Sequence, residues 1–501
     1  MTVRRALRFG AAVVAVSALV ACESPASRGA DDLYLAPEPP SRRESPVSAA
    51  ITTSRATPLT LVEVLSSVAA QHPQQLAAIA ERAAAEGREL ASEGAFDLEL
   101  RGRALWDPRG TYRNHEVLAL LEQPIAWRGL SLFAGYRLGA GDFAPYDGKR
   151  RTSSTGEAIA GVRLPLLRDG AIDPARAGIA QAALDVELAE VAVDALRVDL
   201  ARRAAQEYWS WVAAGQRAAV ARELLEVALA RAAAVREAAA RGELAPVEAD
   251  ENDRQVAVRR VLVAAAERGL EQAALSLSLF LRDDAGHTVL PSRSWLPAAL
   301  PAPAGPIDSE RLAECLARAA VRRPEPKRLA LLAQRAGVDR DLARNQALPW
   351  ISLTATVEPE LSGGGPDGEG GLEVLGGLEL RFPVQRRAAR GREAAASAQL
   401  DALAHQARLL LERIEVEVRD AASALAAAAA RFDQARRARE LALGLERAER
   451  AALELGQSTL LVVNLREQAA AEATLLVIDA AADHQRALAD WRAALGEVGG
   501  G

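Results

Sequence analysis

The sequence has few of the residues from which catalytic and metal sites are built. It contains two cysteines, one methionine (Met1) and five histidines, and no two histidines stand at the spacing of metal ligands. Cys315 has Leu312 and Leu316 at helical spacing, so we expect a small buried apolar residue there and not a nucleophile. The composition therefore predicts neither a metal nor a cofactor.

Catalytic motifs are also missing. The sequence has no P-loop and no serine nucleophile elbow, and its Glu and Asp pairs on helices are typical of solvated faces. A G-x-G-x-x-G pattern occurs at Gly363–Gly368, but it lies between two expected strands, where we interpret it as a hairpin loop. We therefore expect no catalytic residue and no enzyme.

Long apolar runs and a strong excess of one charge are absent as well. Ala11–Val20 is apolar but too short to span a bilayer, and no other stretch approaches 18 uncharged apolar residues. If the chain crosses a membrane, we expect strands to do so. Without Arg4, Arg5 and Arg8 the chain keeps 58 basic against 67 acidic residues, and such mild, dispersed acidity argues against a nucleic-acid partner.

The N-terminal segment has the features of a secretory signal. Residues 1–21 combine a basic start with a short apolar core, and Leu19–Cys22 resembles the lipobox of bacterial lipoproteins. We predict that Cys22 becomes the acylated N-terminus; an ordinary signal with an incidental cysteine is the alternative. Glu23 in place of Asp suits the sorting of such lipoproteins to the outer membrane. Residues 22–57, rich in Pro, Ser and Arg, are expected to form a flexible tether.

The second half of the chain repeats the first half in order. Glu63, Leu65 and Pro73 recur as Glu314, Leu316 and Pro324 at an offset of 251 residues, Pro165 and Arg168 recur as Pro383 and Arg386 at 218, and Arg176 and Gly242 recur as Arg390 and Gly456 at 214. The falling offset places the insertions in the β part of the first repeat. We predict repeat one over 58–284, a Pro-rich linker over 285–307 and repeat two over 308–501.

Each repeat contains segments of strand periodicity, with strands expected over about 95–166 and 350–383. Phe96–Trp106 and Leu372–Phe382 alternate apolar with charged residues, and Leu130–Leu138, Ala158–Leu164 and Ile351–Val357 do so to varying degrees. Such alternation is typical of a transmembrane β-barrel with a wet lumen, although a half-buried sheet in a soluble protein alternates too. Eight of the 19 aromatic residues fall between Phe96 and Tyr146, as in an interfacial girdle, which favours the membrane interpretation. We predict four strands in repeat one and two in repeat two; the alternative is two strands in each repeat, with the extra segment of repeat one folded as a loop over or into the mouth of the barrel.

Very long helices follow the strands. Pro174–Arg241 has no proline after its first residue, and Arg390–Leu455 follows the same plan. The runs end at Gly242 and Gly456 and resume as second helices to about residues 282 and 496. Helices of this length that are never broadly apolar need partners along their length, so we expect a coiled-coil-like assembly. A cytosolic coiled-coil rod is the alternative, against which the signal peptide and strands argue.

From about Leu59 to Gly496 the chain resembles the TolC-like outer-membrane efflux proteins. The resemblance rests on the order, spacing and duplication of five stretches, of which the last is the most specific: Leu59–Leu65 with His72-Pro73, Ala343–Pro349, Leu164–Arg168, Glu207–Ala214 and Leu453–Asn464. It implies a mainly α fold with membrane β structure, in which a homotrimer forms one β-barrel in the outer membrane, continued by a long periplasmic α-helical barrel. It further implies a passive exit duct, coupled to an inner-membrane pump through a periplasmic adaptor protein.

The resemblance also predicts where the periplasmic mouth lies. The turns at Gly242 and Gly456 would form it, and in the family acidic residues six and nine positions after the second glycine can ring the constriction. Those positions are Val462 and Leu465 here, so repeat two supplies no acidic ring. Repeat one offers Glu248, Asp250 and Glu251, whose alternative interpretation is a solvated helix face.

Two other functional classes stay open on sequence grounds. One is a non-conducting structural lipoprotein that spans the periplasm, and the other is a degradative envelope enzyme, against which the absent catalytic groups argue. Within the channel class, the sequence does not separate efflux of drugs or metal ions from protein secretion, and it does not identify the pump or the adaptor.

Overall fold

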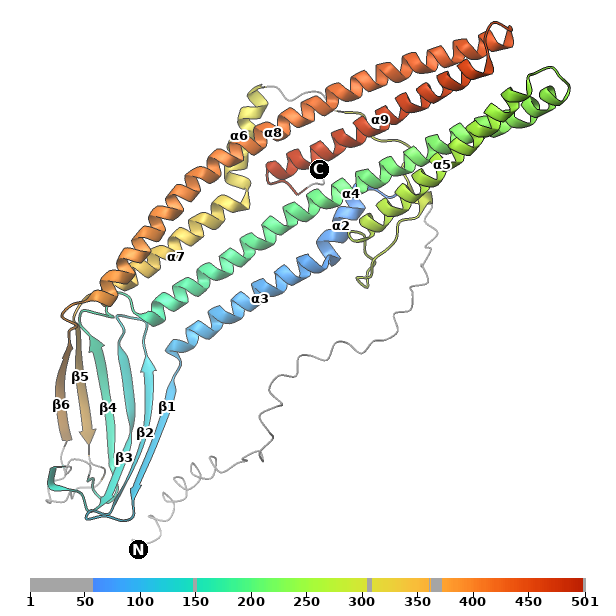
Figure 1. The fold of residues 1–501 in the computed structure, drawn as a ribbon. Coiled ribbons are helices and arrows are strands. Elements are labelled where there is room, and N and C mark those ends of the chain that lie inside the picture. Colours follow the sequence, from blue (N-terminus) through green and yellow to red (C-terminus); the bar gives the residue numbers. More distant parts are fainter. Residues whose placement is uncertain (1–56, 147–150, 304–308, 360, 362–371, 499–501) are drawn as a thin grey trace. The chain divides into compact units, whose positions relative to one another are not determined.

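The computed structural model describes residues 57–146, 151–303, 309–359, 361 and 372–498, all within one unit of the chain, Arg55–Gly501. The predicted signal peptide, the acylation site Cys22 and nearly all of the predicted tether lie outside the described residues, as does Gly363–Gly368. The elements run in the order α2 (Leu61–Gln71), α3 (Pro73–Glu93), η2 (Gly94–Phe96), β1 (Glu99–Asp107), β2 (Asn114–Pro124), β3 (Ser131–Gly141), β4 (Glu157–Pro165), α4 (Pro174–Ala240), α5 (Pro246–Ser278), η4 (Arg293–Trp295), α6 (Ser309–Arg322), α7 (Pro324–Gln346), β5 (Trp350–Pro359), β6 (Leu372–Arg381), α8 (Arg387–Glu454) and α9 (Leu460–Ala494) (Figure 1).

The helices begin where the sequence supplies capping residues. Thr60 and Glu63 form a reciprocal capping box at the start of α2, with Thr60 N donating to Glu63 Oε2 at 2.8 Å. Asp173 caps α4 ahead of Pro174, and its Oδ1 accepts from Arg176 N at 2.8 Å. Proline in the first turn costs no hydrogen bond, because the first backbone N–H groups of a helix have no partner within it.

Each long helix packs along several shorter ones. α4 packs along α3, α5, α7 and α9, and α8 packs along α6, α7 and α9. The end of α5 meets the start of α3, where the His72 ring stacks on Phe280 with 5.7 Å between ring centroids. The end of α9 meets the start of α7 at Gly496, where a φ of +72° and the close approach of the Arg323 backbone both favour glycine.

The main apolar core gathers α2, α4, α5 and the segment around η4. Trp211 and Leu277 lie fully buried in it, and Trp295 packs against them. The Tyr208 hydroxyl donates to Leu59 O at 2.8 Å, which satisfies its polar end inside the core. A second core joins α6, α8 and α9 around Ile414 and contains Cys315, so the prediction of a buried apolar cysteine is confirmed.

The described strands form one antiparallel sheet in the order β1-β2-β3-β4-β5-β6. Of the described strands, β1 to β4 lie before α4, and β5 and β6 lie between α7 and α8, which confirms the predicted strand count. The prediction that the first strand starts at Phe96 is wrong, because Phe96 closes the short helix η2 and its carbonyl accepts from Gln123 Nε2 at 2.7 Å. The ladder therefore starts at Glu99, opposite Glu122.

The junction between the sheet and the long helix α4 brings together two of the stretches on which the family resemblance rests. They are Leu164–Arg168, which Asp169 follows, and Ala343–Pro349. Asp169 has a φ of +67°, and its backbone N–H donates to the buried Asn345 Oδ1 at 2.7 Å. The Arg176 side chain donates to the carbonyls of Gly170 and Ala171 at 3.2 and 3.0 Å. These bonds hold the end of α7 and the start of α4 together beneath the sheet.

Candidate functional site

The strand register separates charged from apolar side chains. Because side chains alternate along each strand and paired residues point the same way, the register assigns every residue to one of two faces. All Asp, Glu and Arg residues of the described strands fall on one of them: Glu99, Arg101, Arg103, Asp107, Glu116, Glu122, Arg137, Glu157, Arg163, Glu358, Glu373, Glu379 and Arg381. The sheet therefore has one charged face.

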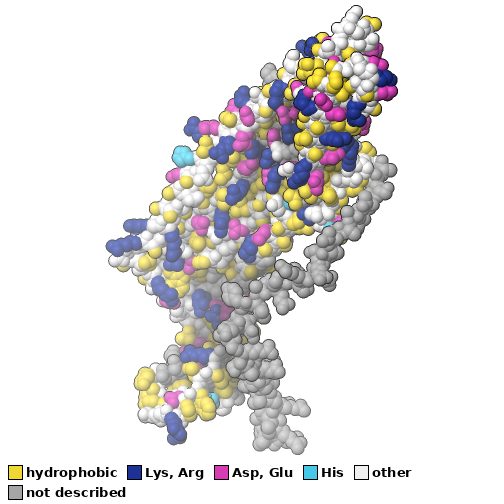
Figure 2. All heavy atoms as spheres, turned by 45° about the vertical axis from the view of Figure 1, so that its right-hand side comes forward, with side chains coloured by type: hydrophobic (Ala, Val, Ile, Leu, Met, Phe, Trp, Pro, Cys, Tyr) yellow, Lys and Arg dark blue, Asp and Glu magenta, His cyan; other side chains and the backbone are white. Residues whose placement is uncertain are grey.

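The opposite face is apolar and exposed. It carries Trp106, which is 80% exposed, together with Leu100, Leu121, Leu132, Val162, Leu353, Val374, Leu378 and Leu380. A contiguous apolar surface of this extent is typical of contact with lipid or with another protein. On the side of the molecule shown in Figure 2, acidic and basic side chains are interspersed along the helices, whereas the sheet shows mostly hydrophobic and uncharged side chains.

Ion pairs on the charged face connect adjacent strands and strands that are one apart in the sheet. The Glu122 carboxylate accepts from Arg101 at 2.9 Å and from Arg163 at 3.2 Å, so it joins β2 to β1 and β4. Arg137 pairs with Glu157 and with Glu358, the latter at 3.3 Å, which joins β3 to β4 and β5. Acidic residues outnumber basic ones on this face, and the face can therefore border water but not lipid.

At the helix end of the sheet, arginines lie over aromatic rings. The Arg381 guanidinium is 4.6 Å from the centroid of the Trp350 ring, and that of Arg386 is 5.6 Å from the centroid of Phe382. Cation–π contacts of this kind hold long side chains in one orientation. These two contacts lie where the sheet gives way to α7 and α8.

The two predicted tip turns have the same geometry. Gly242 and Gly456 have φ values of +76° and +71°, and open space surrounds both Cα atoms. In each turn two backbone bonds close the helix: Gly242 N to Ala239 O and Glu243 N to Ala238 O, then Gly456 N to Leu453 O and Gln457 N to Ala452 O. This hydrogen-bond pattern defines a Schellman motif. Glycine is preferred at the residue after the helix because its backbone adopts a left-handed conformation.

The candidate mouth residues lie in the first two turns of α5 and α9. Among the described residues, neither Glu248 nor Asp250 has an ion-pair partner, whereas Glu251 pairs with Arg254 at 2.7 Å. Hydrogen bonds from Arg254 and Gln255 lower the pKa of Glu251 to about 2. Val462 is half-buried and Leu465 is 57% exposed, so the second turn presents apolar side chains.

The described residues also lack two other kinds of feature. None of their helices is both long and apolar enough to cross a membrane. Within the same residues, no group of three or more His, Cys, Asp or Glu side chains could hold a metal ion.

Comparison with known proteins rests on structure, because no protein-family model and no curated relative matches the sequence. A membrane protein from Pseudomonas aeruginosa superposes with a TM-score of 0.63 at 19% identity, covering 88% of this chain and 92% of its own. The Campylobacter jejuni CmeC outer membrane channel gives 0.60 at 15% identity, covering 87% and 85%. The open state of the Neisseria gonorrhoeae MtrE outer membrane channel gives 0.59 at 16% identity, covering 87% and 89%.

The chain has the fold of the TolC-like outer-membrane channels. The family resemblance stated from the sequence is thus confirmed for the fold, over nearly the whole length of the matched chains. The matched structures are a membrane protein and outer membrane channels.

Sequence reasoning missed a buried ionic cluster between the helices of this TolC-like fold. Glu467 on α9 accepts from Arg259 on α5 at 3.1 Å and from Arg450 on α8 at 3.2 Å, and it also pairs with Arg231 on α4. One carboxylate therefore contacts three arginines from the three other long helices. A signal existed: Glu467 stands at helical spacing between the buried residues Val463 and Ala470, where an apolar residue is the norm.

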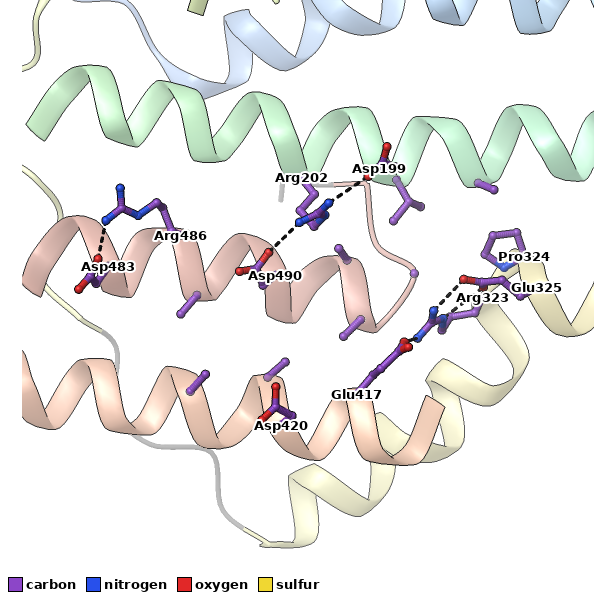
Figure 3. A pocket seen from close by; sticks show the side chains of 18 of the residues that line it. Asp199, Arg202, Arg323, Pro324, Glu325, Glu417, Asp420, Asp483, Arg486 and Asp490 are labelled. Carbon is purple, nitrogen blue, oxygen red and sulfur yellow. Dashed lines mark hydrogen bonds and ion pairs between the residues drawn. The ribbon is translucent and has the colours of Figure 1, made fainter. Parts of the chain in front are cut away.

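A cavity of about 850 Å³ lies where α4, α8 and α9 approach the start of α7 (Figure 3). Its charged lining is largely paired: Asp490 accepts from Arg202 at 3.4 Å, and Arg323 donates to Glu325 at 2.7 Å and pairs with Glu417. Such internally balanced charges fix the mutual position of the helices, and they leave few groups to recognise a ligand.

Proposed function

We propose that this protein is the outer-membrane exit channel of a tripartite efflux or type I secretion system. In this proposal it is a passive duct, coupled to an inner-membrane pump through a periplasmic adaptor protein. The observation that carries the proposal is the sheet, whose strand charges all lie on one face while its other face is apolar and exposed. The TolC-like fold supports the same conclusion.

A homotrimer accounts for the open edges of the sheet. β1 and β6 each have one strand neighbour within the described part of the chain, so their outer edges are open to further pairing. Three copies would supply about eighteen strands, the number at which closed barrels enclose an aqueous channel. The apolar face would then contact outer-membrane lipid, and the charged face would line the water-filled lumen.

The helices would continue the barrel as a periplasmic tunnel of coiled-coil-like packing. The turns at Gly242 and Gly456 lie at the ends of the helices away from the sheet, where the proposal puts the periplasmic mouth. Glu248 and Asp250 would supply the acidic groups of that mouth, with Glu251 held by Arg254, and Val462 and Leu465 would add apolar ones.

Lipid anchoring completes the proposed location. Residues 1–21 would direct export, and acylation of Cys22 would tie the chain to the outer membrane through the tether over 22–57. An internal duplication, 58–284 and 308–501 joined by the linker 285–307, is supported by the element order. Two helices, strands and a long helix pair occur in each part, and the two tip turns share their hydrogen bonds.

The deciding experiment is single-channel recording of the detergent-extracted protein in planar bilayers, with its mass measured by light scattering. A trimer with discrete conductance steps is the expected result. A monomer would contradict the proposal. A trimer that never conducts, even in the presence of adaptor and pump, would favour the alternative of a periplasm-spanning structural lipoprotein.

A further inference from the structure

Polar contacts join the two long helical hairpins in a series. Hairpin A is α4 with α5, and hairpin B is α8 with α9. Along the facing helices, Arg202 pairs with Asp490 at 3.4 Å and Arg217 Nε donates to Asp479 at 2.7 Å. Arg231 then donates to Asn464 at 2.8 Å. These contacts follow the antiparallel course of α4 and α9 toward the turns.

Arg231 also pairs with Glu467, and this contact is far more buried than the other contacts between the hairpins. The pairs at Asp490 and Asp479 are a third or more exposed, whereas the Glu467 side chain is 1% exposed. Two of its arginines, Arg231 and Arg259, come from hairpin A, and the third, Arg450, comes from its own hairpin. A buried ion cluster is costly to break, because separation leaves charges without partners in an apolar environment.

On the tip side of Arg231 and Asn464, no polar contact among the described residues links the two hairpins. Among the described residues there, each hydrogen bond and ion pair stays within one hairpin, as in Arg236 with Asp253 and Ser458 with Glu449. The apolar clusters change in the same way. Ala213 packs against Ile478 across the hairpins, whereas Ala232, just beyond Arg231, belongs to a cluster with Val256 of its own hairpin.

We propose that Glu467 and its three arginines form the pivot of the molecule. The hairpins are fixed to each other at this level, and the segments beyond it move as two independent tips. On hairpin A the free tip is the eleven residues that follow Arg231, up to and including Gly242, with a length of roughly 16 Å. That this motion sets the width of a periplasmic mouth rests on the proposed channel function; the pivot itself does not.

Hydrogen exchange of the full-length protein in detergent, read by mass spectrometry, tests the pivot without any need for conductance. In the native chain, amides on the tip side of residues 231 and 467 exchange faster than those on the sheet side. The test variant is Arg231→Met with Arg259→Met. It removes both links from hairpin A but leaves Glu467 paired with Arg450, so no buried carboxylate loses its last partner.

In the test variant we expect the boundary of slow exchange to move toward Arg217 and Asp479, with residues 218–230 exchanging about tenfold faster or more. Arg450→Met is the matched control, because it removes the contact within hairpin B and keeps both links between the hairpins. An unmoved boundary in the double variant, or an equal shift in the control, would overturn the proposal. Loss of protection along the whole of α4 would also contradict it, since a pivot acts only on the tips.

Discussion

Glu467 Oε2 lies 3.1 Å from Arg259 Nη2, and the two side chains are only 1% and 3% exposed. This pair joins α9 to α5 in the protein interior, where each charge depends on the other. Glu467→Gln would leave Arg231 and Arg259 without the carboxylate that neutralises them. We expect a loss of about 3–5 kcal/mol in the free energy of unfolding, measured by urea titration of the helical circular dichroism signal.

Glu472→Gln is the control for this prediction, since Glu472 is exposed on the same helix. Its effect should stay within about 0.5 kcal/mol. If Glu467→Gln were as mild as the control, the cluster would contribute no net stability.

The strands could largely be predicted from the sequence, because the two faces meet different environments. The least evident was β2, in which five apolar residues follow one another from Val117 to Leu121. The register explains the lost alternation: Leu118 and Leu120 lie on the charged face among Arg103 and Arg137. A sequence pattern shows which residues alternate but not which apolar side chains fill gaps between charged ones.

The tip turns were equally predictable, since a left-handed residue after a long helix favours glycine. The Glu467 cluster was not. Its arginines lie up to 236 positions away in sequence, in helices already rich in arginine, and only the pairing of α4, α5, α8 and α9 brings them together. Helical spacing marks Glu467 itself as a buried position, but it does not show which arginines pair with it.

Gly456→Ala tests the backbone requirement of a tip turn. Because open space surrounds Gly456, the whole effect comes from forcing a left-handed φ of +71° on alanine, which costs about 1–2 kcal/mol. Gly444→Ala is the matched control within α8, where open space and helical backbone predict a gain of about 0.5–1 kcal/mol. The midpoint temperature of thermal unfolding should fall in Gly456→Ala and rise in Gly444→Ala. A shift of both midpoints in the same direction would contradict the turn geometry.

Leu378→Arg tests the proposal that the apolar face of the sheet contacts lipid. Leu378 is 69% exposed on the apolar face, and a lipid-facing arginine costs about 2–4 kcal/mol at the bilayer midplane. We expect reduced insertion, measured by flotation of the protein with outer-membrane vesicles. Leu375→Arg, on the charged face opposite Thr356, should insert normally. Equal insertion of both variants would show that the apolar face does not contact lipid.

Stability should fall in mild acid because two buried histidines favour the neutral form. Burial, together with Arg282 and Arg203, lowers the pKa of His72 below 6.5, and burial lowers the pKa of His484. The unfolded chain therefore binds more protons below about pH 6.5. The stabilisation is complete above that pH and is lost as the pH falls through the folded-state pKa values.

His72→Asn keeps an acceptor for the Gln74 N–H and removes the titration. Its unfolding free energy should decline less between about pH 7 and 5 than that of the native chain. His405→Asn, at an exposed position, should decline as the native chain does. If the unfolding free energy of the native chain and both variants fell equally with pH, groups other than His72 would cause the acid sensitivity.

Neutralising the proposed acidic mouth should change ion selectivity. Glu248 and Asp250 have no ion-pair partners among the described residues, so their charges act on passing ions without compensation. Glu248→Gln with Asp250→Asn is expected to move the reversal potential in a salt gradient toward zero, because the preference for cations falls. The double variant Glu251→Gln with Arg254→Gln removes a neutral pair and should leave the reversal potential in place. If the first variant also left it in place while the protein still conducted, Glu248 and Asp250 would belong to a solvated helix face and not to the mouth of the channel.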